Sequence, residues 1–366
     1  MKNNSFFKII IFGFICVFLV VSCTGPEGPM GQTGADGTNG INGADGKDGA
    51  DGANGTDGTN GVDGNQACLT CHTQAGMDKI GASYASSMHG SPGFELGYAG
   101  VRTGCMECHS NEGFRYHIIG YDPESNLDFA SKITCGTCHG DHINLEEGLT
   151  APMRTDAAVL SLADGITVFD FESSSNTCAN CHQARNNGTA YSSVDTVWND
   201  DESIDFVVHE DSVWVSSSHA GPHYTTMTNN IFGVGGYTDS PGVVMGMHKQ
   251  VGCVGCHMGE SEGTNGGHTM VATLNACTTC HSTATDFDIG GTQTEIHAAE
   301  EELETALVAA GILDANHNTI KGIYSNNVFE AFWNYKIVHY DGSLGVHNPA
   351  YARALINDAK GKLGLN

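Results

Sequence analysis

One short pattern, Cys-x-x-Cys-His, constrains this chain more than any other feature. It occurs six times and uses 12 of the 14 cysteines. The six copies are Cys68/Cys71/His72, Cys105/Cys108/His109, Cys135/Cys138/His139, Cys178/Cys181/His182, Cys253/Cys256/His257 and Cys277/Cys280/His281. Any fold proposed for the chain must explain why these residues recur in this order.

Three chemistries use paired cysteines at this spacing. A zinc site joins two pairs at tetrahedral distance and needs no histidine directly after the second cysteine. A redox dithiol is expected once, near a strand-helix-strand unit. Here a histidine follows all six pairs, although histidine is only 18 of 366 residues. Cys-x-x-Cys-His is the attachment sequence of c-type haem, in which both cysteines bind the porphyrin and the histidine ligates iron, so we expect six covalent haem c groups.

The second axial ligand of each iron is expected among the 12 histidines outside the motifs. The preferred candidates are His89, His142, His219, His248, His268 and His347. His117 and His223 are held in reserve. Ordinary surface or core roles are expected for His209, His297, His317 and His339. Iron with two histidine ligands is closed to substrate, so these haems are expected to carry electrons, and no residue is assigned a catalytic role.

Local sequence supports several of these ligands. "YASSMHG" (84–90) and "WVSSSHA" (214–220) each place an aromatic residue five positions before a histidine, and we expect both to be helical. His248 lies just before a motif, and His268 follows a pair of glycines. Asn348 as N-cap and Pro349 in the first helical turn place His347 at a helix start.

His142 follows His139 by three residues in "ITCGTCHGDH". It cannot reach round the porphyrin to the opposite face of the iron that His139 ligates. If His142 binds iron, it therefore binds that of a neighbouring haem and holds the two haems close together. The alternative is an exposed histidine or one that is hydrogen-bonded to a propionate.

The first 23 residues have the pattern of an export signal. Lys2 and Lys8 precede an apolar run of about 13 residues at 9–21, shorter than the roughly 20 residues needed to span a bilayer. The run ends in Val-Val-Ser-Cys, which resembles the lipobox of bacterial lipoproteins and implies cleavage before a lipidated Cys23. A secretory signal without lipidation is the alternative.

A glycine occupies every third position from Gly25 to Gly64, 14 in succession. This Gly-X-Y period is what a collagen triple helix requires. Prolines occur there only at Pro26 and Pro29, so a disordered, Asp-rich tether remains the alternative to a trimeric triple helix. In either case the segment is a spacer.

Charge narrows the choice of partners. The formal net charge is −27, with 15 Lys and Arg against 42 Asp and Glu. Binding to nucleic acid, or to an anionic bilayer through a basic patch, is therefore disfavoured. Other redox proteins or extracellular electron acceptors are the expected partners, with a homotrimer through the Gly-X-Y stalk.

Four segments are expected along the chain. They are a signal peptide (1–22), a lipidated cysteine and collagen-like stalk (23–65), a hexahaem domain (66–290) and a helical C-terminal segment (291–366). Apolar periodicity predicts helices at 295–313 and 324–338, and a third is expected at 348–363. Short β-prone pieces such as "ITVFDF" are separated by loops. The expected fold is mostly α with extensive coil, organised by haem.

The region from Cys68 onward resembles bacterial multihaem c-type cytochromes of respiratory electron transfer. The stretch "AFWNYKIVHYDGSLGVHNPAYARALINDAKGKL" (331–363) is similar to the terminal helices of the superfamily that includes ammonia-forming nitrite reductases and hydroxylamine oxidoreductases. This resemblance implies stacked and perpendicular haem pairs and a ligand role for His347. No Cys-x-x-Cys-Lys motif is present, so the lysine-ligated catalytic haem common in the nitrite reductases is not implied.

The leading functional expectation is electron transfer through six bis-histidine haems in a respiratory chain that reaches outside the cell. The protein is expected to be an outer-membrane lipoprotein exposed at the cell surface, with the periplasmic face as the alternative. Two other functions stay open. One is a reductase of nitrogen or sulfur oxyanions with one five-coordinate haem, which would make the protein an oxidoreductase. The other is a subunit of a cytochrome filament.

Overall fold

The computed structural model describes residues 73–91, 96–140, 153–191, 211–238 and 244–365, together with the backbone of 196–198 and 204–207. Several predicted features lie outside these residues. They are the signal peptide, Cys23, the Gly-X-Y segment, the first motif (Cys68, Cys71 and His72) and His142.

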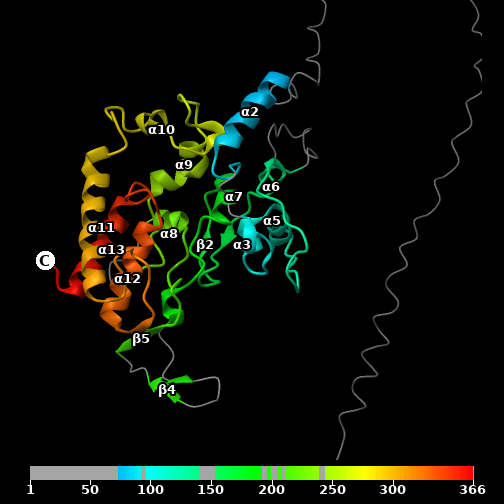
Figure 1. Cartoon of the computed structure of the whole chain (residues 1–366). Coiled ribbons are helices and arrows are strands. Elements are labelled where there is room, and N and C mark those ends of the chain that lie inside the picture. Colours follow the sequence, from blue (N-terminus) through cyan, green and yellow to red (C-terminus); the bar gives the residue numbers. More distant parts are fainter. Residues whose placement is uncertain are drawn as a thin grey trace, which may run out of the picture. The chain divides into compact units, whose positions relative to one another are not determined.

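Three long helices form the best-packed part of the described chain. They are α11 (Thr292–Ala309), α12 (Asn326–His339) and α13 (Pro349–Leu363). The three helices lie side by side (Figure 1). Nine of the 14 residues of α12 are buried, so this helix is covered on most of its circumference. Helices were predicted in these three places, and the structure confirms them with small differences at their ends.

Local capping explains where two of these helices begin. Ser325 Oγ accepts a hydrogen bond from the Val328 amide at the start of α12. Asn348 Oδ1 accepts one from the Tyr351 amide at the start of α13, and Pro349 occupies the first turn. Both side chains satisfy amides that have no partner within the helix. The predicted start of α13 directly after His347 is therefore confirmed.

A two-stranded sheet joins this helical region to the middle of the chain. Strand β5 (Ser212–Val215) pairs antiparallel with β6 (Gly322–Ser325). Val213 and Val215 of β5 are buried in the same hydrophobic cluster as α11, α12 and α13. We call this cluster the C-terminal core.

The motif region, residues 73–290, is built from much shorter elements. Its helices are α2 (Gln74–Ser86), α3 (Gly97–Val101), α4 (Met106–His109), α5 (Asn111–Ile118), α6 (Cys135–Cys138), α7 (Ser175–Ala179), α8 (Met227–Phe232), α9 (Gly246–His257) and α10 (Leu274–Thr278). Single 3-10 turns are η2 (Gly188–Tyr191), η3 (Gly267–Thr269) and η4 (Ile289–Gly291). Figure 1 shows these pieces connected by long coil segments. Within the described residues, no helix is both long and apolar enough to cross a bilayer.

The remaining strands form two more antiparallel pairs. Strand β1 (Val159–Leu160) pairs with β2 (Val168–Phe169), and β3 (Thr196–Trp198) pairs with β4 (Ile204–Val207). With three two-stranded sheets in its described part, the chain is mostly helix and coil. The expected fold class is confirmed at this level.

Two local predictions are wrong. The segment 84–90 was expected to be helical, but α2 ends at Ser86 because Ser87 donates both its amide and its hydroxyl to Tyr84 O, and His89 lies in the turn beyond. The segment 214–220 was also expected to be helical, but Trp214 belongs to β5 and pairs with β6. Pairing with a strand about 110 residues away overrides the local preference.

Candidate functional site: five facing histidine pairs

The described Cys-x-x-Cys-His motifs form compact helical turns. In four of them the histidine amide donates to the carbonyl of the first cysteine: His109 to Cys105, His139 to Cys135, His182 to Cys178 and His281 to Cys277, at 3.2, 2.9, 3.0 and 2.8 Å. The remaining described motif, Cys253/Cys256/His257, forms the end of α9. Residues three apart on a helical turn share one face. Each turn therefore presents its two sulfurs together, with the histidine beside them.

Each of the five described motif histidines faces one histidine from outside the motifs. The pairs and their ring-centroid separations are His182 with His89 (6.0 Å), His139 with His268 (6.1 Å), His109 with His223 (6.2 Å), His257 with His347 (6.2 Å) and His281 with His248 (6.4 Å). The partners come from sequence positions before and after the motifs. The tertiary fold, and not local sequence, therefore assembles these pairs.

This separation fits one metal ion between two imidazoles. Two metal–nitrogen bonds of about 2 Å, with about 1 Å more from each nitrogen to its ring centre, place the centroids roughly 6 Å apart. Ordinary aromatic contacts also span about 4.5–7 Å, so one such distance alone would not discriminate. The recurrence at every described motif, within a range of 0.4 Å, does discriminate. Two cysteines, their histidine and the facing histidine form the donor set that haem c uses.

Burial favours the neutral imidazole in half of the paired histidines, whereas at His347 the neighbouring Asp341 carboxylate outweighs burial and raises the pKa. Burial is the main cause that lowers the pKa of five of the paired histidines: His89, His182, His223, His257 and His268. For His182 the pKa falls to about 4. A histidine must be neutral to bind a metal. At neutral pH these five side chains are therefore in the form that can ligate iron.

Hydrogen bonds at Nδ1 orient several of the rings. His257 Nδ1 donates to Met270 O at 3.0 Å, and His248 Nδ1 donates to His347 O at 3.4 Å. His89 Nδ1 lies 2.9 Å from the Met270 sulfur. A partner at Nδ1 fixes the ring and directs Nε2 toward the opposite histidine, as is usual for metal-ligating histidines.

The structure places the predicted second ligands unequally. His89, His248, His268 and His347 each face a motif histidine. His219 does not: it is exposed, and its Nδ1 hydrogen-bonds the Tyr224 hydroxyl at 3.3 Å. His223, which the sequence only held in reserve, faces His109 instead.

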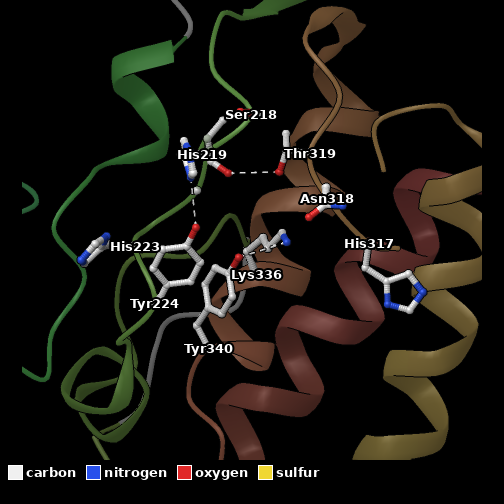
Figure 2. A pocket seen from close by; sticks show the side chains of 11 residues that line it. Ser218, His219, His223, Tyr224, His317, Asn318, Thr319, Lys336 and Tyr340 are labelled. Atoms are coloured by element: carbon white, nitrogen blue, oxygen red, sulfur yellow. Dashed lines mark hydrogen bonds between the residues drawn. The ribbon is translucent and has the colours of Figure 1, made fainter. Parts of the chain in front are cut away.

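Both of these histidines line a small polar pocket (Figure 2). Its walls include His219, Tyr224, Lys336 and Tyr340, and its volume is about 90 Å³. Burial lowers the pKa of Lys336 to about 8, and its ammonium donates to the Tyr340 hydroxyl at 3.1 Å. Pockets for small-molecule ligands usually measure about 300–1,000 Å³. This pocket therefore gives little support to a substrate site.

The C-terminal core positions the fourth motif through α8. Thr226 Oγ1 and Asn230 Nδ2 both donate to Ile337 O of α12, at 2.7 and 2.9 Å. On the other side of α8, the Thr228 amide donates to His182 O at 3.0 Å. The helices of the C-terminal core are thus linked to the motif histidine through α8 by three hydrogen bonds.

Neighbouring motifs approach one another closely. The thiols of Cys178 and Cys253 lie close together, as do those of Cys108 and Cys181. Cys108 Sγ donates to Asn180 O and Cys181 Sγ donates to Glu107 O. The backbone permits the first approach because Gly252 adopts a positive φ of 67°, and a Cβ there would lie 2.4 Å from Ser175 Oγ. The second, fourth and fifth motifs therefore form a contiguous group.

The third motif is fixed by Arg154. Its guanidinium donates to Gly136 O at 2.9 Å and to His139 O at 3.0 Å. Its amide donates to Cys138 O at 2.7 Å. These bonds hold the turn in one orientation, with His139 facing His268.

The chain is similar to a known protein family in one segment and to a solved structure in another comparison. Residues 23–68 match the family Collagen triple helix repeat, which confirms the Gly-X-Y reading of that segment. The chain is similar to one solved structure, "Crystal Structure of Outer Cell Wall Cytochrome OcwA", with 21% identity over 78% of this chain and a TM-score of 0.48. The match covers 50% of that protein, so the chain spans about half its length. No curated protein sequence matches the chain.

Proposed function

We propose that this protein is an electron-transfer cytochrome that holds six covalent haem c groups, each between two histidines. The recurrence of a facing histidine at every described motif carries this proposal. When bound, haem supplies an iron that changes its charge by one electron. The chain's own residues attach the group through cysteine sulfur, ligate it on both faces and exclude other ligands.

The facing pairs assign five sets of ligands, with His223 in place of His219. The sixth motif histidine, His72, and the candidate His142 both lie outside the described residues. We assign them to each other. His268 faces His139, so the opposite side of that centre already has a ligand, which supports the expectation that His142 serves another haem.

The close approach of the motifs supports conduction through the protein. The second and fifth motifs both contact the fourth through their thiols, and the third motif lies near it through Cys138. The sixth follows the fifth, because Cys256 lies near Cys277 and Cys280. Haems attached at these cysteines would be neighbours. The fourth haem is therefore the branch point of our proposed path.

A reductase would need a haem with one open axial position. Each of the five described motif histidines has a histidine opposite it, so none of these centres offers that position in our assignment. The haem of His72 is the place where an open position would be sought. We therefore propose a carrier and keep the reductase as the alternative.

The N-terminal segment is proposed to anchor and extend the protein. We propose that a lipid on Cys23 holds the chain at the outer membrane and that the stalk extends the haem-binding part toward redox partners outside the cell. The match of residues 23–68 to collagen repeats supports such a stalk, and three chains would form it as a triple helix. The segments 1–22, 23–65, 66–290 and 291–366 are kept as proposed divisions.

A matched pair of variants tests the ligand assignment. His223→Ala should convert one haem from low-spin to high-spin in the EPR spectrum of the oxidised protein, because His109 loses its facing ligand. His219→Ala, four residues away, should leave all haems low-spin. A high-spin signal from His219→Ala with none from His223→Ala would overturn the assignment.

A second pair tests the sixth centre. His142→Ala should create one high-spin haem without altering the haem attached at Cys135 and Cys138, whereas His117→Ala should alter none. Combination with His268→Ala identifies the centre, because that variant opens the haem of His139. The assignment of His142 is wrong if His142→Ala leaves every haem low-spin.

A further inference from the structure

A buried carboxylate contacts one of the facing histidines. Asp341 Oδ1 accepts a hydrogen bond from His347 Nδ1 at 2.6 Å, and Asp341 is only 3% exposed. The Ser343 hydroxyl donates to the other carboxylate oxygen. Among the described residues, no lysine or arginine forms an ion pair with Asp341. The negative charge of this group therefore acts mainly on His347.

The opposite histidine of the same pair is also polarised. His257 Nδ1 donates to the Met270 carbonyl at 3.0 Å. A hydrogen bond from Nδ1 to a strong acceptor raises the electron-donating power of the imidazole. Both rings of the His257–His347 pair thus have strong acceptors, one of them an anion.

The Nδ1 atoms of His89 and His248 contact weaker hydrogen-bond acceptors. In the His89–His182 pair, His89 Nδ1 lies against the Met270 sulfur, and thioethers are weak acceptors. In the His248–His281 pair, His248 Nδ1 reaches the His347 carbonyl at 3.4 Å, near the limit of a hydrogen bond. The buried carboxylate at Nδ1 of His347 is a stronger acceptor than either this sulfur or this distant carbonyl.

We infer that Asp341 is a positioning residue that lowers the reduction potential of the haem held between His257 and His347. A stronger donor ligand and a buried negative charge both favour ferric over ferrous iron. The two effects therefore have the same sign. This inference rests on the bis-histidine ligation proposed above.

The fifth motif, which contains His257, lies between the fourth and the sixth motifs. The fifth motif contacts the fourth through Cys253 and Cys178, and it lies near the sixth through Cys256 and Cys277. An electron that moved between haems held at the fourth and sixth motifs would pass the haem whose reduction potential Asp341 lowers. Asp341 would thereby set the difference in reduction potential between this haem and its neighbours.

The test is a spectroelectrochemical titration of the full protein with its haems. Asp341→Asn removes the charge and keeps an oxygen that accepts the Nδ1 proton. One of the six couples should rise, with the ratio of ferrous to ferric haem at fixed potential increasing about tenfold, which corresponds to about 59 mV for one electron. The EPR spectrum should stay low-spin.

A second variant predicts the opposite sign. Ser343→Ala removes the hydroxyl that donates to Asp341, so the carboxylate becomes a stronger acceptor and the same couple should fall. Asp358→Asn is the matched control. Asp358 accepts hydrogen bonds from Asn334 and Lys362 and contacts none of the paired histidines, so its removal should move no couple.

The outcomes separate this inference from the proposed function. Six unchanged couples in Asp341→Asn and Ser343→Ala, with all haems still low-spin, would overturn the role of Asp341 and leave bis-histidine ligation standing. If His347→Ala produced no high-spin haem, the ligation itself would fail. A shift of one couple in Asp341→Asn with the control silent supports the inference.

Discussion

The motif region and the C-terminal helices of this protein are stabilised in different ways. Among the described residues, 15 of the 17 exposed large apolar side chains lie before residue 291, whereas 11 of the 12 largest fully buried side chains lie after it. Most helix lengths follow the same division: α4 and α6 have four residues and α11 has 18, although α2 of the motif region has 13. Helices as short as α4 and α6 are not stable alone in water.

The difference indicates what holds each region together. The C-terminal core buries phenylalanine, tryptophan and leucine against one another, which is the ordinary source of stability. In the described part of the motif region, a small cluster surrounds Phe169, Phe171 and Phe232. In our account, haem supplies the apolar surface that this part of the sequence lacks.

Blocking haem attachment should have the largest effect on the difference in stability between the motif region and the C-terminal helices. Protein produced without haem attachment should be digested rapidly within 73–290, while α11, α12 and α13 stay protected because their core needs no cofactor. Limited proteolysis followed by mass spectrometry locates the cuts. Equal protection of both regions would contradict the contrast.

A leucine pair compares the two regions directly. Leu303→Ala truncates a side chain that is 0% exposed and should lower the free energy of unfolding by about 2–5 kcal/mol. Leu160→Ala truncates one that is 54% exposed, and it should change that free energy by less than about 0.5 kcal/mol. Denaturant unfolding of the haem-loaded protein measures both. Equal losses would break the comparison.

A glycine pair tests how the motif region uses its backbone. Gly252→Ala should destabilise the protein by about 1–3 kcal/mol, because alanine is strained at positive φ and its Cβ would meet Ser175. Gly246→Ala is the control, since a Cβ there meets no atom within 4 Å. Thermal unfolding distinguishes the two. Similar melting temperatures would mean that the fourth and fifth motifs tolerate a wider spacing.

An ion pair on the helical region should have the smallest effect. Arg353 lowers the pKa of Glu295, with which it forms an exposed ion pair between α11 and α13. Because the folded pKa is the lower one, this stabilisation is present above the unfolded pKa and is lost as pH falls through the folded pKa. Glu295→Gln should cost less than about 1 kcal/mol at neutral pH, and the difference from wild type should vanish in acid. If the difference in free energy of unfolding between wild type and Glu295→Gln grew in acid, the predicted pH dependence would be wrong.

Sequence reasoning succeeded where a signal was local. Apolar periodicity and the Asn348 cap predicted the C-terminal helices, which the structure confirms. The assignment of the motif histidines as haem ligands stays a prediction. The sequence alone could not predict which histidines face each other, because pairs such as His89 and His182 meet only after the chain has folded.

His223 faces a motif histidine although the sequence held it only in reserve. It lies in "GPHY" with no periodicity, and it adopts a positive φ of 81° that few residues other than glycine favour. Strain of this kind is often found at functional sites. His219 was preferred because its segment resembled that of His89, but pairing of Trp214 in β5 removed the helix on which that comparison depended.

Low-temperature EPR of the purified, oxidised protein, with haem content measured by mass spectrometry, tests the central claim most directly. If paired histidines close every iron, the protein will contain six covalent haems and its spectrum will be entirely low-spin. A stoichiometric high-spin haem, accompanied by turnover of nitrite or hydroxylamine, would contradict this account and identify the protein as a reductase.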